Sequence, residues 1–455
     1  MKSPYKKAHF ITNPASAIFF SFGVAIIIGA IILYLPISSH THLRWIDALF
    51  TSTSAVCVTG LIVVDTGSFF TLFGQMVILL LIQMGGLGII TFSIIFFIMA
   101  GKSISVRDQL IVQSSFTHKW RKGAKNLIKN IFILTFVIEF VGAFLLFSEW
   151  QKTMSPLKAV YFSIFHAISA FCNAGFSLFP ENLIPFKNNP FIILVFGSLI
   201  ILGGLGFMAL IEIPKFLKPE NKIKKLSLHT KIVLITTTTL LLIGGVLFFL
   251  LEQNNVLKGM SISNKIINSI FQSITARTAG FNTVNFSQLT NATLFIFILL
   301  MFIGASPGGT GGGIKTINIA ILFSLAFNRL KGRNDVVIFK RSVPAETVGR
   351  SISILIGSFI ALTAILSLLL MTQQANIPHT QARGIFLELL FETTSAFGTV
   401  GLSMGSTAKL TDSGKLLIII MMYLGRIGPL SLAAILAQKF KKKEIHYGEE
   451  DLFIG

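Results

Sequence analysis

The chain has 455 residues and a formal net charge of +20; 53% of its residues are hydrophobic and only 12% are charged. Its mean hydropathy of +0.78 excludes a soluble globular protein, because soluble cores cannot hide so much apolar surface, and indicates a polytopic membrane protein. The basic residues lie in short loops between apolar segments and form no stripe or groove, which argues against a nucleic-acid partner. The two cysteines, Cys57 and Cys172, exclude a disulfide framework and are expected to be small buried residues.

One order of elements occurs four times along the chain: an apolar span, a half-helix, a turn with glycine, and a second span. Repeat one, residues 1–105, contains Ala17 to Leu35, Trp45 to Val56, Gly60 and Leu72 to Ala100. Repeat two, residues 106–225, contains Leu127 to Phe147, Leu157 to Phe171, Gly175 and Pro190 to Leu210. Repeat three, residues 226–340, contains Ile232 to Leu251, Ile266 to Ala276, Gly280 and Ala292 to Phe327. Repeat four, residues 341–455, contains Ile352 to Met371, Arg383 to Phe397, Gly401 and Lys415 to Ala437.

The half-helices are too short to cross a bilayer. A helix over Trp45 to Val56 reaches only about 18 Å, against a hydrocarbon core about 30 Å thick. Each half-helix must therefore enter the membrane and return on the same side. The sequence predicts an all-α membrane protein with eight transmembrane helices and four re-entrant half-helices around one central pore.

The half-helices and their turns are similar in sequence. In each, a Phe is followed by Ala five residues later and then by a Gly, ten residues after the Phe in three repeats and nine in the third. The four stretches are Phe50 to Leu61, Phe165 to Phe176, Phe271 to Phe281 and Phe391 to Ser403. Glycine lets such turns point backbone carbonyls inward, and a half-helix directs its negative C-terminal end to the same point. Carbonyls around an axis replace the water shell of an alkali cation.

A single copy would be better explained as a surface helix with glycine as its C-cap, but four copies between spans favour the ring.

The second span of repeat three contains a glycine-rich break, where no helix is expected to persist. Broken backbone at membrane depth is tolerated where it is buried in protein or lines a wet cavity. A phosphate-binding loop is disfavoured, because Ile314 separates the glycines from Lys315. Shorter glycine clusters in the other second spans are expected either to mark related features or to allow close helix packing. The break contains Gly304, Ala305, Ser306, Pro307, Gly308, Gly309, Thr310, Gly311, Gly312 and Gly313.

Assigning alternate loops to one side places 26 Lys and Arg residues there and ten on the other. The positive-inside rule then predicts that both termini are cytoplasmic.

The triplet Thr399-Val400-Gly401 resembles the filter of potassium channels, and the fourfold layout is similar to the Trk/Ktr/HKT superfamily of potassium transporters over essentially the whole chain. Within it, the short N-terminus and the final Glu449 to Gly455 are most similar to the KtrB-type membrane subunits of bacterial Ktr uptake systems. The resemblance implies a K⁺ selectivity filter, with K⁺ the only metal bound. One filter glycine per repeat implies fewer carbonyl sites than in channels. The implied filter residues are Val58, Thr59, Gly60, Asn173, Ala174, Gly175, Thr278, Ala279, Gly280, Thr399, Val400 and Gly401.

The same resemblance implies that the glycine-rich break is an intramembrane gate below the filter, acting with Lys315 and Arg426. A fixed cation in a narrow path opposes cation flow. Alternatively, Arg426 joins helix ends by bonding their free carbonyls. The acids Glu139, Glu388, Glu392 and Asp65 are left open between roles in ion movement and structural hydrogen bonding.

The basic loop Lys331 to Arg341 carries an apolar run, so Val337, Phe339, Lys340 and Arg341, together with Ile454 and Gly455 at the end of the chain, are expected to dock a protein partner. The resemblance implies a homodimer in the bacterial plasma membrane, with one pore per subunit and a cytosolic nucleotide-binding RCK ring of the KtrA type. No cofactor is expected in this chain; the nucleotide belongs to the ring, and dependence on Na⁺ is left open.

The alternative function is an ion-coupled secondary transporter of a small solute, since broken helices at mid-membrane also occur there. Those folds usually contain two inverted repeats, whereas here all four half-helices lie on one side. An enzyme is disfavoured, because the sequence contains no nucleophile with a base and no paired metal ligands.

Overall fold

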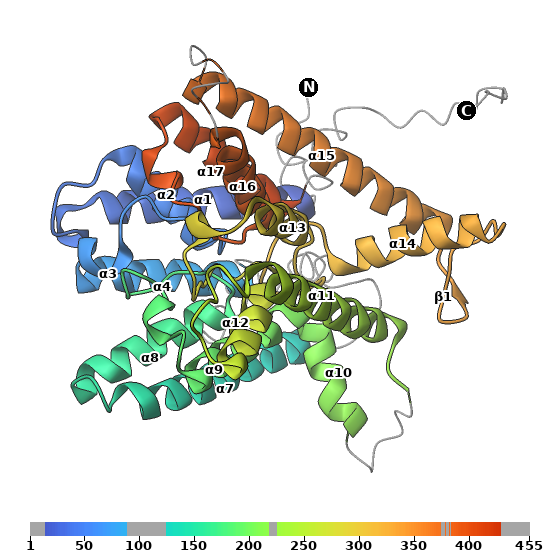
Figure 1. Ribbon diagram of the computed structural model, residues 1–455, viewed down its shortest axis with the longest axis horizontal. Coiled ribbons are helices and arrows are strands. Elements are labelled where there is room, and N and C mark those ends of the chain that lie inside the picture. Colours follow the sequence, from blue (N-terminus) through green and yellow to red (C-terminus); the bar gives the residue numbers. More distant parts are fainter. Residues whose placement is uncertain are drawn as a thin grey trace, which may run out of the picture.

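The computed structural model describes residues 14–88, 124–217, 225–374, 378, 382 and 384–428. The regular secondary structure of the described part is helical apart from one two-stranded hairpin. Figure 1 shows that the four repeats, coloured from blue through green and yellow to red, follow one another around the centre of the molecule. They are named units one to four below.

Each unit contains a long helix, a half-helix that ends in the turn with glycine, and a second helix that follows this turn in the chain. Unit one consists of α1 (Pro14–Tyr34), η3 (Pro36–Ser38), α2 (Trp45–Val56), α3 (Thr66–Phe69) and α4 (Leu72–Leu87). Unit two consists of α7 (Ala124–Trp150), α8 (Pro156–Phe171), η4 (Ile184–Phe186), α9 (Pro190–Leu205) and α10 (Phe207–Leu217). Unit three consists of α11 (Leu228–Glu252), α12 (Ile262–Thr275), η5 (Phe286–Gln288), α13 (Asn291–Phe302) and α14 (Thr316–Leu330). Unit four consists of α15 (Ala345–Gln374), α16 (Ile385–Gly398), η6 (Thr407–Lys409) and α17 (Asp412–Ile427), and the hairpin of β1 (Val337–Ile338) and β2 (Arg341–Ser342) precedes it.

Several helices start at side-chain caps that the sequence carries. The side chains of Ser261, Thr290 and Thr411 accept hydrogen bonds from the backbone N–H three residues later, at the starts of α12, α13 and α17. Such caps satisfy N–H groups that have no partner inside the helix. In unit two, Pro156 and Pro190 occupy the first helical positions, where the missing N–H costs nothing.

The repeated Phe and Ala positions are explained by packing. Each Phe of the half-helices is at most 1% exposed and contributes to the core, and each Ala is completely buried where small size lets the neighbouring helix approach. These residues are Phe50, Phe165, Phe271 and Phe391, and Ala55, Ala170, Ala276 and Ala396. Cys57 and Cys172 are free thiols and fully buried, as predicted.

In units one, two and four the helix of the second span ends earlier than predicted, which corrects the continuous spans expected there. Helix α4 ends at Leu87, α9 ends at Leu205 and α17 ends at Ile427, and each is followed by a glycine with positive φ: Gly88, Gly206 and Gly428. The bend between helices α9 and α10, at Gly206, is 103°. The remainders of two predicted spans, residues 89–100 and 429–437, lie outside the described residues.

Glycines just before these breaks also allow close packing. A methyl group on Gly85, Gly203 or Gly425 would lie 1.9 to 2.0 Å from a carbonyl oxygen of Val56, Phe171 or Phe397, near the end of the half-helix of the same unit. No side chain fits there, so each second helix packs directly on the backbone of its half-helix.

Three described helices are long and apolar enough to cross a membrane: Ile128–Trp150, Leu228–Glu252 and Ala345–Gln373. The bent pair α9–α10 would be a fourth. A helical membrane protein is therefore confirmed, and the number of eight spans stays a prediction.

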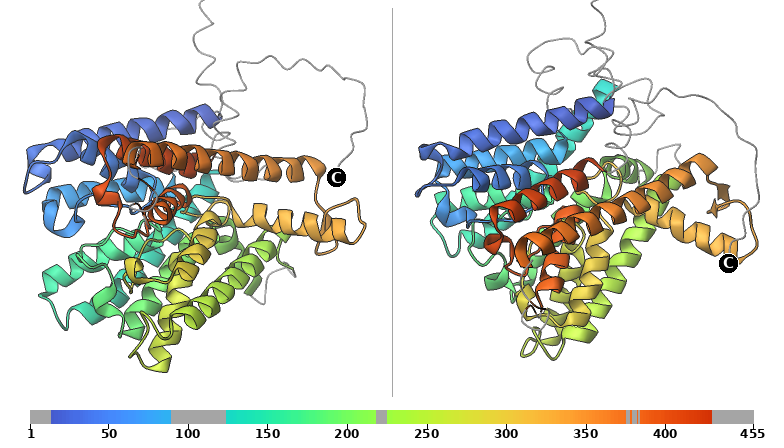
Figure 2. Two further views of the ribbon diagram at one scale, coloured as in Figure 1. Left: turned by 45° about the horizontal axis from the view of Figure 1, so that its top comes forward. Right: turned by 90° about the horizontal axis from the view of Figure 1, so that it is seen from above.

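Helix α14 and the β1–β2 hairpin extend away from the centre of the bundle, together with the first part of α15 (Figure 2). The hairpin pairs Val337 with Ser342 and Ile338 with Arg341. Its two turn residues, Phe339 and Lys340, both have positive φ, as a tight turn between antiparallel strands requires.

Candidate functional site

The four half-helices end in the same unusual backbone conformation. Two residues before each repeat glycine, a non-glycine residue has positive φ: Val58 (50°), Asn173 (57°), Thr278 (69°) and Thr399 (48°). The glycines Gly60, Gly175, Gly280 and Gly401 have φ between 72° and 89°. L-residues rarely adopt this region, and β-branched ones least of all, so its recurrence at one place in every unit indicates a functional constraint.

Unit three reaches this conformation with one residue fewer. In the other units, the N–H before the glycine donates to a carbonyl five residues back, at 2.8 Å: Thr59 to Ser54, Ala174 to Ser169 and Val400 to Ser395. In unit three, Ala279 donates to Thr275, four residues back, at 3.1 Å. The tighter turn absorbs the shortening, and Thr278 takes the same position as its counterparts.

The four glycines form a closed ring. A methyl group on Gly60 would lie 2.4 Å from the carbonyl oxygen of Ala174, and one on Gly175 would lie 3.0 Å from that of Ala279. In the same way Gly280 faces the carbonyl of Val400 at 2.5 Å, and Gly401 faces that of Thr59 at 2.1 Å. Each unit thus touches the next, and unit four touches unit one. Glycine is required because any side chain would push the neighbouring unit outward.

The carbonyl groups of the ring have no hydrogen-bond partner within the described part of the chain. This holds for all three residues of each segment: Val58 to Gly60, Asn173 to Gly175, Thr278 to Gly280, and Thr399 to Gly401. The glycine N–H groups, in contrast, are held in two units: Gly60 donates to Ser54 Oγ at 3.1 Å and Gly401 to Ser395 Oγ at 3.0 Å. Buried carbonyls are almost always paired in proteins, so this set of free acceptors around one axis is suited to a cation.

A cavity of about 460 Å³ lies on one side of the ring and is lined by all four glycines. Its other lining residues follow the glycines in sequence and include the acids Asp65 and Glu181 and the amides of Asn282 and Asn285. No Lys or Arg side chain is among the described residues that line it. The cavity therefore favours cations at the mouth of the ring.

The glycine-rich break lies on the side of the ring opposite to this cavity. It contacts residues that precede the ring glycines in sequence. Gly312 N–H donates to Thr399 Oγ1 at 2.8 Å. A methyl group on Gly311 would lie 1.9 Å from Thr278 Oγ1, so the loop passes directly under this hydroxyl.

The loop is held by the broken ends of neighbouring second helices. Ser306 and Thr310 donate their N–H groups to the carbonyls of Gly204 and Gly203, at 3.0 and 3.1 Å. Gly313 donates to the carbonyl of Gly425 at 3.2 Å. At its base, Gly304 N–H bonds Ile314 O at 2.8 Å and closes the loop on itself. The remaining predicted gate residues complete this turn: Pro307, Gly308 and Gly309.

Two cations bind carbonyls of the loop. Lys315 Nζ donates to Gly311 O at 2.6 Å. The guanidinium of Arg426 donates to Thr310 O in the loop and to Gly85 O near the end of α4. Within the described residues neither cation forms an ion pair. Arg426 thus joins a helix end to the loop by bonding their carbonyls, as the second alternative expects, and its role as a barrier to cations stays a prediction.

A third basic side chain near the loop, that of Arg277, was not predicted from the sequence. It follows the end of α12, immediately before Thr278, and is only 7% exposed. Its Nη2 lies 3.5 Å from Gly304 O, the first residue of the loop. The available signal was the repeat itself: units one, two and four have Cys57, Cys172 and Gly398 at this place.

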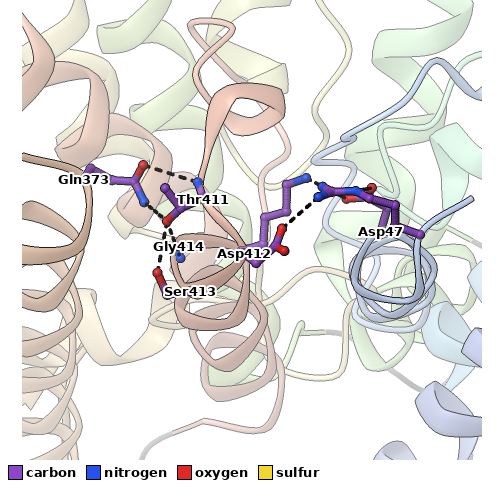
Figure 3. Close-up of polar contacts among 8 residues, drawn as sticks. Asp47, Gln373, Thr411, Asp412, Ser413 and Gly414 are labelled. Carbon is purple, nitrogen blue, oxygen red and sulfur yellow. Dashed lines mark hydrogen bonds and ion pairs between the residues drawn. The ribbon is translucent and has the colours of Figure 1, made fainter.

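Units one and four are joined by a buried ion pair near the start of their helices. Lys415 Nζ in α17 lies 2.6 Å from Asp47 Oδ1 in α2, and both residues are buried. Arg44 bonds the second oxygen of Asp47 at 2.9 Å and lies 3.1 Å from Asp412 (Figure 3). The contact between units one and four is therefore stabilised by this ion pair as well as by packing.

The acids left open by sequence all accept hydrogen bonds from other described residues. Glu392 accepts from Ser403 Oγ, Thr407 Oγ1 and Met404 N–H, and so ties the half-helix α16 to the segment after Gly401. Glu388 accepts from Ser406 Oγ at 2.5 Å, and Asp65 caps α3 through Ser68. Glu139 lies 3.3 Å from the amide of Gln83.

The predicted docking residues Val337, Phe339, Lys340 and Arg341 lie on the β1–β2 hairpin and in its turn, away from the ring. Ile454 and Gly455 lie outside the described residues.

The chain is similar to known transport proteins. The family described as TrkH, cation transport protein, matches residues 10–445. The Ktr system potassium uptake protein B of Bacillus subtilis is 39% identical over 446 residues, and the match covers 97% of each chain. The potassium/sodium uptake protein NtpJ of Enterococcus hirae is 36% identical over 450 residues, again with 97% of each covered.

The crystal structure of the potassium transporter TrkH from Vibrio parahaemolyticus has the same fold, with a TM-score of 0.71 at 20% identity, over 97% of this chain and 87% of that one. The family match spans nearly the whole chain, and the two relatives agree with it. The chain therefore belongs to the TrkH family of cation transport proteins, which are ion transporters and not enzymes.

Proposed function

We propose that this protein is a potassium uptake pathway and that K⁺ passes through the ring formed by the four half-helix turns. The observation that carries this proposal is the set of ring carbonyls without hydrogen-bond partners in the described part of the chain, at a cavity with acidic lining. Such carbonyls replace the hydration shell of an alkali cation. The names of the relatives, which are potassium uptake proteins, support the choice of K⁺.

The proposed architecture has eight transmembrane helices and four re-entrant half-helices around this one pore. The excess of basic residues in alternate loops supports cytoplasmic termini, in the plasma membrane of a bacterium.

Selection among alkali cations is proposed to be looser than in channels with two filter glycines, because each unit supplies one. A relative named for both potassium and sodium uptake is consistent with this. Na⁺ is therefore the ion against which selection has to be measured.

The glycine-rich loop, residues 304–313, is proposed to be the gate. It lies under Thr278 and Thr399, and Lys315 and Arg426 bind its carbonyls and add positive charge in the cation path. Flow then requires the loop to leave this position.

The partner is proposed to be a cytosolic RCK-type ring on a homodimer of this chain. The hairpin supports a contact, because Phe339 at its tip is 50% exposed and two cations, Lys340 and Arg341, follow it. An exposed aromatic residue beside basic ones is typical of an anchor in a protein interface.

The test is ion flux into liposomes with K⁺, Rb⁺, Na⁺ and Li⁺, comparing wild type with Gly401→Ser. A side chain at Gly401 is strained at its φ of 88° and meets the carbonyl of Thr59. Strain and clash together amount to about 1–3 kcal/mol, so the ratio of K⁺ to Na⁺ flux is expected to fall by about tenfold.

The matched control is Gly405→Ser. Gly405 has the same strained backbone, with φ of 91°, but nothing lies within 4 Å of a side chain placed there. Its flux ratios should equal those of wild type. Identical ratios in all three proteins would contradict the assignment of the ring as the filter.

A further inference from the structure

Arg277 stands out because its burial has no compensating charge. It is 7% exposed, and the described residues provide no carboxylate within ion-pair distance. Its one hydrogen bond from the guanidinium, to Gly304 O, is long at 3.5 Å, and its Nε has no partner in the described part of the chain. Burying a charge without a partner is costly, so such a residue is retained for something other than stability.

The surroundings of Arg277 include a small cavity of about 20 Å³. Arg277, Gly204, Thr237 and Ala305 line it, together with apolar side chains. Thr237 Oγ1 is also buried and has no hydrogen-bond partner among the described residues. A cavity of this volume accommodates one water molecule, which needs about two to four polar partners, and these two side chains supply them.

The position of Arg277 links the two parts of the pathway. The backbone of the next residue, Thr278, belongs to the ring, while the guanidinium reaches Gly304 and the cavity touches Ala305, the first two residues of the loop. The C-terminal end of half-helix α12 carries a partial negative charge, which lowers the free-energy cost of burying the guanidinium beside it. In the other units the corresponding residues, Cys57, Cys172 and Gly398, have no guanidinium that could make such a link, and the loop of residues 304–313 belongs to unit three.

Resting on the proposed function, we propose that Arg277 is a positioning residue that couples the third filter segment to the gate loop. It does so by a direct hydrogen bond to Gly304 O and through one water molecule shared with Thr237. The coupling holds the start of the loop in its blocking place under the ring.

The test uses full-length protein in liposomes and four variants: Arg277→Gln, Arg277→Lys, Thr237→Val and, as matched control, Thr135→Val. Thr135 in α7 is also completely buried with an unpartnered hydroxyl, but it does not line the cavity. Initial K⁺ flux and the K⁺ to Na⁺ flux ratio are measured, with thermal unfolding in detergent recorded for each variant.

Arg277→Gln is expected to raise K⁺ flux about tenfold, as loss of one hydrogen bond to a charged group implies, without lowering the unfolding temperature. Arg277→Lys should behave similarly, because an ammonium cannot reproduce the guanidinium fork. Thr237→Val should raise flux about twofold, and Thr135→Val should leave it unchanged.

Three outcomes would overturn the inference. The first is equal flux in wild type, Arg277→Gln and Thr237→Val. The second is wild-type flux in Arg277→Lys with raised flux in Arg277→Gln, since charge alone would then explain the effect. The third is a lower unfolding temperature with unchanged flux, which indicates a purely structural residue. If the arginine variants do not fold, the comparison of Thr237→Val with Thr135→Val decides. A wild type that moves no K⁺ overturns the proposed function as well, which separates the two failures.

Discussion

Val58 and Thr399 are β-branched residues in a backbone region that β-branched residues rarely adopt. Both are completely buried, so the surrounding packing holds them there. Strain of this kind costs about 1–3 kcal/mol for each residue. This strain occurs at the same place in all four units. It lowers the stability of the fold and sets the orientation of the backbone in the ring. The sequence predicted the glycine in each turn from its spacing, but nothing in its residue types predicted the strain two positions earlier.

Arg426 offers a test of the gate at the level of one side chain. It binds carbonyls of Thr310 and Gly85, and each hydrogen bond from a charged donor contributes about 1.5 kcal/mol or more. Of these two bonds the one to Thr310 holds the loop, so its loss in Arg426→Ala is expected to raise K⁺ flux about tenfold in liposomes. Arg426→Lys should raise it less, because the charge is kept and one bond is lost.

The control for this prediction is Arg350→Ala. Arg350 lies on α15, is 63% exposed and pairs with Glu346 away from the pathway. Its removal should leave flux unchanged. Unchanged or lower flux in folded Arg426→Ala protein would show that Arg426 only joins helix ends.

At the level of elements, the half-helices were predicted to within a few residues. The structure ends α2 at Val56 and α8 at Phe171, as predicted, and starts α12 at Ile262, four residues before the predicted start. Apolar runs with repeated Phe and Ala define these elements locally, so sequence is sufficient for them. The starts depend on caps such as Ser261, which a reading of hydrophobicity does not detect.

The breaks in the second helices were predicted only in unit three. Gly206 interrupts an apolar run that reads as one span, and hydrophobicity stays high on both sides of it. The break depends on tertiary contacts, since Phe207 N–H beyond it donates to Gly308 O in the loop of another unit. Arg277 was overlooked for a similar reason, because its partner Gly304 lies 27 residues away and no local pattern connects them.

The ion pair between α2 and α17 can be tested as a link between elements. Asp47 and Lys415 are buried, and Asp47→Leu leaves Lys415 as a buried charge without a partner, at a cost of about 3 kcal/mol or more. Lys415→Met should destabilise the protein less, because Asp47 keeps its pair with Arg44. The double variant should be milder than Asp47→Leu, because it leaves no unpaired charge at this position.

Thermal or chemical unfolding in detergent measures this. Asp412→Asn is the control, since its pair with Arg44 is exposed and should contribute less than about 1 kcal/mol. Additive single and double variants would show that the pair does not join the two units.

At the scale of the whole molecule, the repeat in the sequence predicted how the four units are arranged. Four similar stretches spaced along the chain predicted a ring, and the structure brings Gly60, Gly175, Gly280 and Gly401 around one cavity in chain order. Repetition is informative at this scale because equivalent sequences fold alike and must pack alike. Subunit number and partners lie beyond the chain itself, and no repeat within it specifies them.

The hairpin gives a test at this scale. Phe339→Ser is expected to weaken capture of a purified KtrA-type ring by about tenfold, because it removes an exposed aromatic anchor from the tip of the hairpin. Leu157→Ser is the control, since Leu157 is 84% exposed and lies in the first turn of half-helix α8, on the opposite side in the proposed orientation. Equal capture of both variants, measured by co-purification in detergent, would place the contact elsewhere.

The closed contact between Gly401 and Thr59 has a consequence for how the protein is made. Gly60 leaves the ribosome early, whereas Gly401 follows when most of the chain has been synthesised. Until then the ring is incomplete, with a gap between its first and third quarters, and the proposed filter has not formed. If the ring is the filter, a prematurely terminated chain is expected to be inactive however well it inserts, and the proposed pore forms only when the last quarter joins the first.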